Sequence, residues 1–253
     1  MPDAFVKTAP AGDLGMFEAE AAGLEELRRA GEIRVPAVLE VGVRDGQSYI
    51  ALERLSLERP STGVTRQMGE QLARLHAHTA ERHGWSRDNT IGPTPQPNAE
   101  SADWVAFFRE RRLGFQLALA AQNGYRGELA EAGAEVLERL PRLFEGYRPQ
   151  PSLLHGDLWG GNWGAADGEP VIFDPAVYYG DRETDLAMTR LFGGFGREFY
   201  AAYESAWPLA PGHEPRVALY QLYHVLNHLN LFGSGYLGQA LALMRRLLAG
   251  ELA

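Results

Sequence analysis

A polar segment in the second half of the chain constrains its fold more than any other feature. Residues 155–162 read His-Gly-Asp-Leu-Trp-Gly-Gly-Asn, and residues 171–174 read Val-Ile-Phe-Asp. The short apolar runs around them predict a strand, a Gly-rich turn and a second strand. Asp157 and Asn162 then lie in one loop, and Asp174, at the end of the following strand, supplies a carboxylate from the other side.

These side chains are the ones that phosphoryl transfer requires. The reaction needs a carboxylate beside the attacking hydroxyl group and oxygen ligands that hold magnesium against the phosphates of ATP. The order His-Gly-Asp, then Asn, then Asp-Pro-Ala matches the pattern of a kinase catalytic loop. Asp157 is predicted to orient or deprotonate the hydroxyl group, Asn162 and Asp174 to bind Mg²⁺, and His155 to brace the loop. The alternative is a turn with coincidental polar residues, because Asp, Asn and Gly are common turn formers.

Upstream, a kinase needs a lysine on a strand to hold the α- and β-phosphates of ATP, and a helix glutamate to orient it. Lys7 follows an apolar pair, and the next predicted helix is rich in glutamate. Residues 20–27 resemble the corresponding helix of aminoglycoside-phosphotransferase-like kinases, so Glu20 is the predicted partner of Lys7. The alternative is a lysine and a glutamate-rich helix that both face solvent.

Residues 49–55 fall where the strand that contacts adenine is expected. The backbone groups of Glu53 and Leu55 are predicted to bind the edge of the adenine ring. The alternative is an ordinary buried strand. The two interpretations differ only in whether the end of the strand contacts a nucleotide.

The apolar spacing predicts an α+β protein with two lobes. Residues 1–60 are expected to form a small α/β lobe that binds ATP, with a hairpin at Asp45-Gly46. Residues 61–253 are expected to form a larger, mostly helical lobe that carries the catalytic loop and binds the substrate. Sites often lie between two such lobes, which join near residues 55–61. The individual elements predicted are a strand ending at Lys7, helices over 16–30, 62–82, 101–121 and 126–146, strands over 36–44 and 47–55, and a loop over 88–101.

Composition narrows the classes of partner. The chain has no cysteine, which excludes a disulfide framework and a thiolate metal site. Its net charge of −9, without a dense Lys/Arg block, argues against nucleic acid. No segment approaches the roughly 18 consecutive apolar residues of a membrane span, and the first residues lack the apolar run of a signal peptide. A cytoplasmic protein without nucleic-acid or membrane partners is expected.

Motifs across nearly the whole chain make it resemble the fructosamine kinases, also called ketosamine 3-kinases. The most specific are Trp159 within the catalytic loop and the sequence Asp-Asn-Thr-Ile-Gly-Pro-Thr-Pro-Gln-Pro-Asn at 88–98. Further matching stretches lie at 103–113, 174–180, 185–188, 191–195 and 220–233.

The resemblance implies a bilobal, protein-kinase-like fold and an enzyme that uses ATP and Mg²⁺. It also implies phosphorylation of the 3-hydroxyl group of a ketosamine, a sugar joined to an amine by the Amadori rearrangement, in deglycation. The amine belongs to a small molecule or to a lysine of a protein. Asp185 is expected to brace the catalytic loop from behind. Trp159 has two possible roles, packing on the sugar or packing in the core.

Two departures from the family pattern bear on function. The family usually begins with two further strands and a Gly-rich loop over the ATP phosphates, and the residues before Lys7 are too few to form them. The small lobe is therefore expected to be incomplete at its N-terminal side, and a catalytically weak nucleotide-binding module is one alternative. Asp181 stands where the family commonly has His. The wider phosphotransferase superfamily often has Gly-Asp there, so this departure bears on substrate preference and leaves the kinase assignment in place. A kinase of another small hydroxyl compound, such as an aminoglycoside or choline, is the second alternative.

His224 and His228 lie one helical turn apart and could suggest a metal site. They lack the intervening Glu and the third ligand of a zinc motif. We therefore expect two histidines whose rings are hydrogen-bonded within the protein, and not a metal site.

Overall fold

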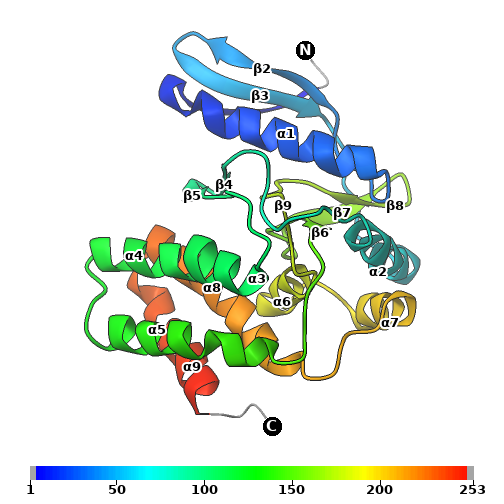
Figure 1. Ribbon diagram of the computed structural model, residues 1–253. Coiled ribbons are helices and arrows are strands. Elements are labelled where there is room, and N and C mark those ends of the chain that lie inside the picture. The colour runs from blue at the N-terminus through cyan, green and yellow to red at the C-terminus, as the bar shows by residue number, and fades with distance from the viewer. Residues whose placement is uncertain (1–3, 250–253) are drawn as a thin grey trace.

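The computed structural model describes residues 4–249, and its small lobe is an antiparallel three-stranded sheet with one helix packed on it (Figure 1). The elements are β1 (Ala4–Pro10), α1 (Leu14–Ala30), β2 (Val38–Arg44) and β3 (Gln47–Glu53). β3 is the central strand, paired with β1 on one side and β2 on the other. Asp45 and Gly46 have φ angles of +53° and +75°, which fit the tight hairpin expected there.

The larger lobe is mostly helical, with α8 at its centre in contact with α4, α6 and α9. Its helices are α2 (Thr62–His76), α3 (Trp104–Phe107), α4 (Phe115–Gln122), α5 (Glu128–Arg139), α6 (Glu183–Leu191), α7 (Arg197–Ala206), α8 (Glu214–Phe232) and α9 (Leu237–Leu248). Its strands pair two by two: β4 (Asn89–Ile91) with β5 (Thr94–Gln96), β6 (Ser152–Leu154) with β9 (Tyr178–Gly180), and β7 (Trp163–Ala166) with β8 (Glu169–Ile172).

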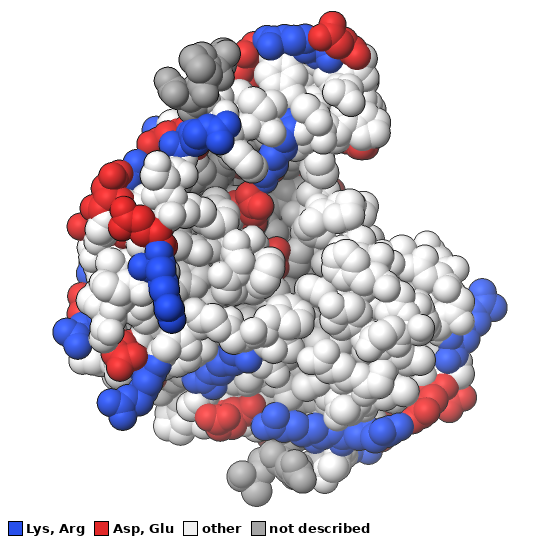
Figure 2. All heavy atoms as spheres, turned by 180° about the vertical axis from the view of Figure 1, so that it is seen from behind, with Lys and Arg blue, Asp and Glu red and all other residues white. Residues whose placement is uncertain are grey.

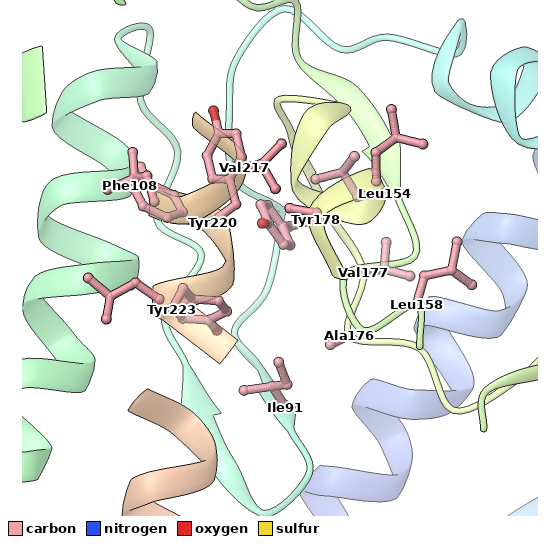
Figure 3. Close-up of a cluster of buried hydrophobic side chains, with 14 of the residues drawn as sticks. Ile91, Phe108, Leu154, Leu158, Ala176, Val177, Tyr178, Val217, Tyr220 and Tyr223 are labelled. Carbon is pink, nitrogen blue, oxygen red and sulfur yellow. The ribbon is translucent and has the colours of Figure 1, made fainter. Parts of the chain in front are cut away.

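Aromatic side chains fill the core of the larger lobe directly behind the predicted catalytic loop (Figure 3). Tyr220 of α8 meets Phe108 edge to face at a centroid distance of 5.1 Å, and Tyr178 of β9 lies in the same cluster. Leu158 of the loop and Val177, just after Asp174 in sequence, are buried in this cluster as well. The core therefore supports both segments that carry the predicted catalytic groups.

Two predictions of secondary structure were wrong. The helix predicted over 62–82 ends at His76, because residues 79–84 form isolated bridges with Ser152, Ser101 and Tyr179. Those bridges satisfy backbone groups that a longer helix would have used. The segment 88–101, predicted as a loop, contains the β4–β5 hairpin.

The other helices begin or end close to their predicted limits. The helix predicted over 101–121 starts at Trp104, where Asp103 caps it by accepting the Ala106 amide at 2.9 Å. It then runs through a π-helical turn at Phe108–Gly114 into α4. The helix predicted over 126–146 is α5 followed by a 3₁₀ turn over Leu140–Phe144.

Residues 55–61 form an irregular link from the small lobe, fixed to β7 by a bond of 2.8 Å from the Glu58 amide to the Ala165 carbonyl. The mixed helix and strand content confirms the expected α+β class, while the boundary at residue 60 stays a prediction. Among residues 4–249, none of the helices has the length and apolarity needed to cross a membrane.

Candidate active site

The predicted catalytic loop follows β6 and turns sharply at Gly156. Its φ is +83°, and a methyl group at this position would lie 2.0 Å from the carbonyl oxygen of Ala176. Only glycine fits so close to another backbone segment at this φ. The close approach brings Asp157 and Asp174 to the walls of one pocket.

Asp185 of α6 holds the loop through backbone amides. Its carboxylate accepts hydrogen bonds from the amides of His155 (2.8 Å) and Gly156 (2.9 Å). Nδ1 of His155 accepts from the Asp157 amide at 3.2 Å, so Nε2 carries the proton and donates to the Phe173 carbonyl at 3.0 Å. Burial lowers the pKa of His155, which keeps this ring neutral. Both residues lie behind the loop, where the sequence placed them.

Asn162 links the two aspartates. Its Nδ2 donates to the backbone carbonyl of Asp157 at 2.9 Å, to Oδ2 of Asp157 at 3.2 Å and to the carbonyl of Asp174 at 3.4 Å. Because the nitrogen is committed, the amide oxygen is the atom that remains for a cation. Burial raises the pKa of Asp157 to about 7, and the charges of Asp185 and Asp174 add to this shift. A carboxyl group with such a pKa is suited to exchange a proton with a hydroxyl group.

Lys7 of β1 reaches from the small lobe to the catalytic segment. Its Nζ lies 2.7 Å from Oε1 of Glu20 and 2.6 Å from Oδ1 of Asp174. Burial lowers the pKa of Lys7, but the two carboxylates outweigh it and the net shift is upward, so the ammonium group stays charged. The side chains of Lys7 and Glu20 are only 23% and 13% exposed, which contradicts the solvent-facing alternative.

A pocket of about 280 Å³ opens beneath the end of β3, where the adenine contacts were predicted. Glu53 and Leu55 both line it, together with the apolar side chains of Phe5, Leu52, Leu57 and Phe173. The Glu53 amide already donates to the Ala37 carbonyl at 2.8 Å, and the Glu53 carboxylate pairs with Arg34 at 2.9 Å. The Leu55 amide bonds no protein group among the described residues, so it is the better placed of the two predicted backbone contacts.

A second pocket of about 380 Å³ contains the predicted catalytic groups. Lining it are Lys7, Glu20, Asp157, Trp159, Asn162 and Asp174. Sequence reasoning missed the rest of the wall, which comes from α1, from the β4–β5 hairpin and from the residue after Asp174: Met16, Phe17, Asn89, Thr90, Gly92, Pro93 and Pro175. The unusual sequence at 88–98 was the available signal, but it served only to recognise a family.

A buried polar network fixes this hairpin against the catalytic segment. Asn89 donates from Nδ2 to the Val177 carbonyl at 2.8 Å, and its Oδ1 accepts from Gln96 (2.9 Å) and Asn98 (2.8 Å). Arg112 donates to Oδ1 of Asn98 at 2.6 Å and stacks on neighbouring aromatic rings. The Asn and Gln residues of the motif therefore hold the pocket wall in place.

Trp159 does not pack in the core, because its side chain is 40% exposed and lines the second pocket. Its indole ring lies over Gly161, where a methyl group would be 2.3 Å from Cη2 of the ring. Trp159 and Phe192 meet edge to face at a centroid distance of 6.4 Å. Of the two roles open from the sequence, the structure favours contact with a ligand.

Asp181 lies away from both pockets. It is fully buried and accepts hydrogen bonds from the hydroxyl groups of Tyr220 (2.6 Å) and Tyr147 (3.0 Å) and from the Glu183 amide (3.0 Å). β9 pairs antiparallel with β6, and this pairing carries Asp181 to the end of β6 opposite the catalytic loop. Because its side chain lines neither pocket, any effect of Asp181 on substrate preference would act through the packing of the larger lobe.

The histidine pair on α8 is only partly as expected. Nδ1 of His228 bonds the His224 carbonyl at 2.8 Å. Nδ1 of His224 is buried and has no partner among the described residues.

A two-lobed fold in which a strand lysine and a helix glutamate face such a loop is that of the protein-kinase-like phosphotransferases, which act on hydroxyl groups with ATP as donor. The family model for fructosamine kinase matches residues 2–250, and the chain belongs to that family.

Individual relatives agree with this assignment. A protein of Synechocystis sp. described as a probable ketoamine kinase is 48% identical, over 96% of this chain and 82% of its own length. A chloroplastic protein-ribulosamine 3-kinase of Oryza sativa subsp. indica is 44% identical, over 95% of this chain and 71% of its own length. A crystal structure from Haemophilus somnus 129PT, provisionally described as a fructosamine-3-kinase, is similar with a TM-score of 0.90 and 31% identity, covering 97% of this chain and 83% of that one.

More distant structures share only the fold. An ADP-bound aminoglycoside phosphotransferase has a TM-score of 0.62 at 12% identity, over 94% of this chain and 85% of that one. The expected bilobal, kinase-like architecture is confirmed.

Proposed function

We propose that this protein transfers the γ-phosphoryl group of ATP to the 3-hydroxyl group of a ketosamine, such as a fructosamine or a ribulosamine. The observation that supports this most directly is the meeting of Lys7, Asp157, Asn162 and Asp174 in one pocket, in a chain of the fructosamine kinase family. The substrate is a small ketosamine or a glycated lysine of a protein. The relatives are described as ketoamine and ribulosamine kinases. They therefore argue against the two alternatives, which are a kinase of an aminoglycoside-like or choline-like compound and a catalytically weak nucleotide-binding module.

Asp157 carries the central step of the proposed reaction. The 3-hydroxyl group donates a hydrogen bond to its carboxylate while the hydroxyl oxygen attacks the γ-phosphorus. The new P–O bond forms, the bond to the β–γ bridging oxygen breaks, the proton moves to Asp157 and ADP leaves. Asp185 and His155 act on this step only by holding the loop in position.

The donor set suits magnesium. The amide oxygen of Asn162 and the carboxylate of Asp174 are hard oxygen ligands, and Mg²⁺ is usually held by one or two protein groups plus phosphates and water. Within residues 4–249 no cluster of three or more His, Asp or Glu side chains offers a fuller cage. The ion, when bound, neutralises charge on the β- and γ-phosphates.

The nucleotide would extend from the first pocket to the second. The adenine ring fits the apolar pocket below Leu55, and Lys7, oriented by Glu20, would hold the α- and β-phosphates. Asp174 lines both pockets, as expected for the place where the phosphates pass between them. We expect the reaction to run in the cytoplasm, where ATP is supplied.

An assay of ADP release with Mg²⁺, ATP and ribulosyl- or fructosyl-lysine tests the proposal. The Asp157→Asn variant should lose at least about 100-fold in kcat, the usual contribution of a positioned acid–base group. The matched control is Asp45→Asn at the exposed β2–β3 turn, where Asn tolerates the positive φ and turnover should be unchanged. Equal ketosamine-dependent turnover in the parent protein and the Asp157 variant would contradict the proposed role.

A further inference from the structure

Aromatic rings continue from the catalytic loop onto the surface of the larger lobe. We call Phe192, His228, Phe232 and Tyr236 the aromatic strip. Phe192 meets Trp159 at 6.4 Å and His228 at 4.9 Å between ring centroids. His228 in turn meets Phe232 at 5.4 Å and Tyr236 at 5.1 Å. The rings thus form one connected series from the pocket to the C-terminal end of α8.

The strip is continuous with the second pocket. Trp159 lines that pocket together with Asp157, and its side chain also contacts the first ring of the strip. The opposite rim of the pocket approaches the same end of α8, since a methyl group at Gly92 would lie 3.6 Å from Cδ1 of Leu231. A ligand bound at Asp157 that is longer than the pocket therefore meets the strip as it leaves.

The exposed part of the strip is large and apolar. Phe192 and Phe232 are 40% and 66% exposed. Figure 2 shows the molecule hollowed between its two parts, with acidic side chains deep in the hollow and a wide face without charged side chains beside its mouth. Exposed apolar patches that adjoin a pocket commonly mark binding surface.

The chemistry of the substrate indicates what reaches this surface. In a ketosamine only the carbons C2 and C1 separate C3, whose hydroxyl group reacts, from the amine nitrogen. When that hydroxyl group lies at Asp157, the nitrogen must lie close by and the group attached to it must leave the pocket. The nitrogen is a protonated secondary amine near neutral pH, and such a cation is attracted to the face of an aromatic ring.

We propose that the aromatic strip binds the amine-carrying part of the ketosamine and selects carriers with an apolar or aromatic group next to the glycated nitrogen. This inference rests on the proposed function. It assigns Trp159 and Phe192 to the region nearest the nitrogen, and Phe232 and Tyr236 to the more distant part of the carrier. Ketosamines with a small hydrophilic carrier leave the strip uncovered and gain no binding free energy from it.

Two synthetic ketosamines with the same sugar test the proposal, one made from methylamine and one from phenethylamine. For the parent protein we expect kcat/KM to be about tenfold higher for the phenethylamine adduct, mainly through a lower KM, because one aromatic contact is worth about a factor of ten. In Phe192→Ala, which removes the ring of the strip nearest the nitrogen, this preference should fall to within about twofold. Leu39→Ala, which removes an exposed apolar side chain on β2, should keep the full preference.

Equal kcat/KM for both adducts in the parent protein, or a preference that survives in Phe192→Ala, would overturn the inference. If neither adduct is phosphorylated, the proposed function fails instead. Calorimetric titration in the presence of a non-hydrolysable ATP analogue then decides the inference without turnover. Tighter binding of the phenethylamine adduct to the parent than to Phe192→Ala supports the strip, and equal affinity contradicts it.

Discussion

Nζ of Lys7 lies 2.6 Å from Oδ1 of Asp174, although 167 positions separate the two residues in sequence. This ion pair connects β1 of the small lobe to the segment that follows β8 in the larger lobe. Glu20 fixes the same ammonium group from α1 at 2.7 Å. The position of Lys7 therefore depends on both lobes, and it lies where phosphates would pass between the two pockets.

Replacing Lys7 by Met should remove the positive charge while keeping an apolar stem of similar length. We expect kcat/KM for ATP to fall at least about 100-fold, the typical effect of losing a preorganised charge-stabilising donor. Circular dichroism should show an unchanged fold. Steady-state kinetics at varied ATP is the measurement, and a loss below about threefold would contradict the assigned role.

Lys7 is the only lysine in the sequence, which permits a second, independent test. A lysine-selective acylating reagent should modify a single ε-amino group, slowly because both carboxylates hold it charged. Mg²⁺ and ATP together should slow this modification further. Peptide mass spectrometry measures the extent of labelling, and labelling that ATP does not affect would place the nucleotide elsewhere.

Arg112 should be a major contributor to stability. It is fully buried, donates to Oδ1 of Asn98 and to the Pro97 carbonyl, and its loss leaves both acceptors without their donor. We expect Arg112→Met to lower the free energy of unfolding by about 3 kcal/mol. The control variant Arg111→Met, at an exposed neighbouring position, should change the free energy of unfolding by less than about 0.5 kcal/mol. Urea unfolding measures both, and the KM for the ketosamine should rise in Arg112→Met because the β4–β5 hairpin loosens.

Buried neutral histidines should make stability fall in acid, and His83 offers the clearest case. Burial lowers its pKa to about 4, with Asp103 opposing the shift. Between that value and the ordinary pKa of about 6.5 the unfolded chain binds the extra proton, so stability falls as pH falls. From pH 7 to pH 5 His83 should contribute a loss of about 2 kcal/mol.

His83→Phe keeps the ring that packs on Trp104 and removes the titrating group. The loss of unfolding free energy between pH 7 and pH 5 should be about 2 kcal/mol smaller in this variant than in the parent. Above pH 7.5 the two proteins should show the same pH dependence, because the ring is then neutral in both states. If the unfolding free energies of the parent and His83→Phe depend on pH in the same way down to pH 5, the lowered pKa of His83 is contradicted.

The catalytic loop could be proposed from the sequence because its information is local. Asp157 and Asn162 lie in one turn, and Asp174 lies two residues after β8, the second strand of the next hairpin. Lys7 and Glu20 required a resemblance, since a single lysine before a glutamate-rich helix also fits a solvated surface. Their ion pair forms only when α1 packs on the three-stranded sheet of the small lobe, and no local pattern shows that packing.

The β4–β5 hairpin could not be predicted from its own residues. A stretch rich in Pro and Asn is typical of a loop. Its strands are fixed by distant partners, among them Arg112, which stabilises Asn98, and Tyr223 of α8, which bonds Gln96 at 2.7 Å. The surroundings of Asp181 could not be predicted for a similar reason, because the pairing of β9 with β6 decides which way it faces.

The position of the transferred phosphate tests the central claim most directly. Phosphorus NMR can follow the parent protein with Mg²⁺, ATP and a ribulosyl or fructosyl amine. We predict a phosphomonoester signal coupled to the proton on C3 of the sugar, growing in step with ADP and absent with Asp157→Asn. A phosphate on another hydroxyl group, or ADP released without any sugar ester, would contradict the assignment of this protein as a ketosamine 3-kinase.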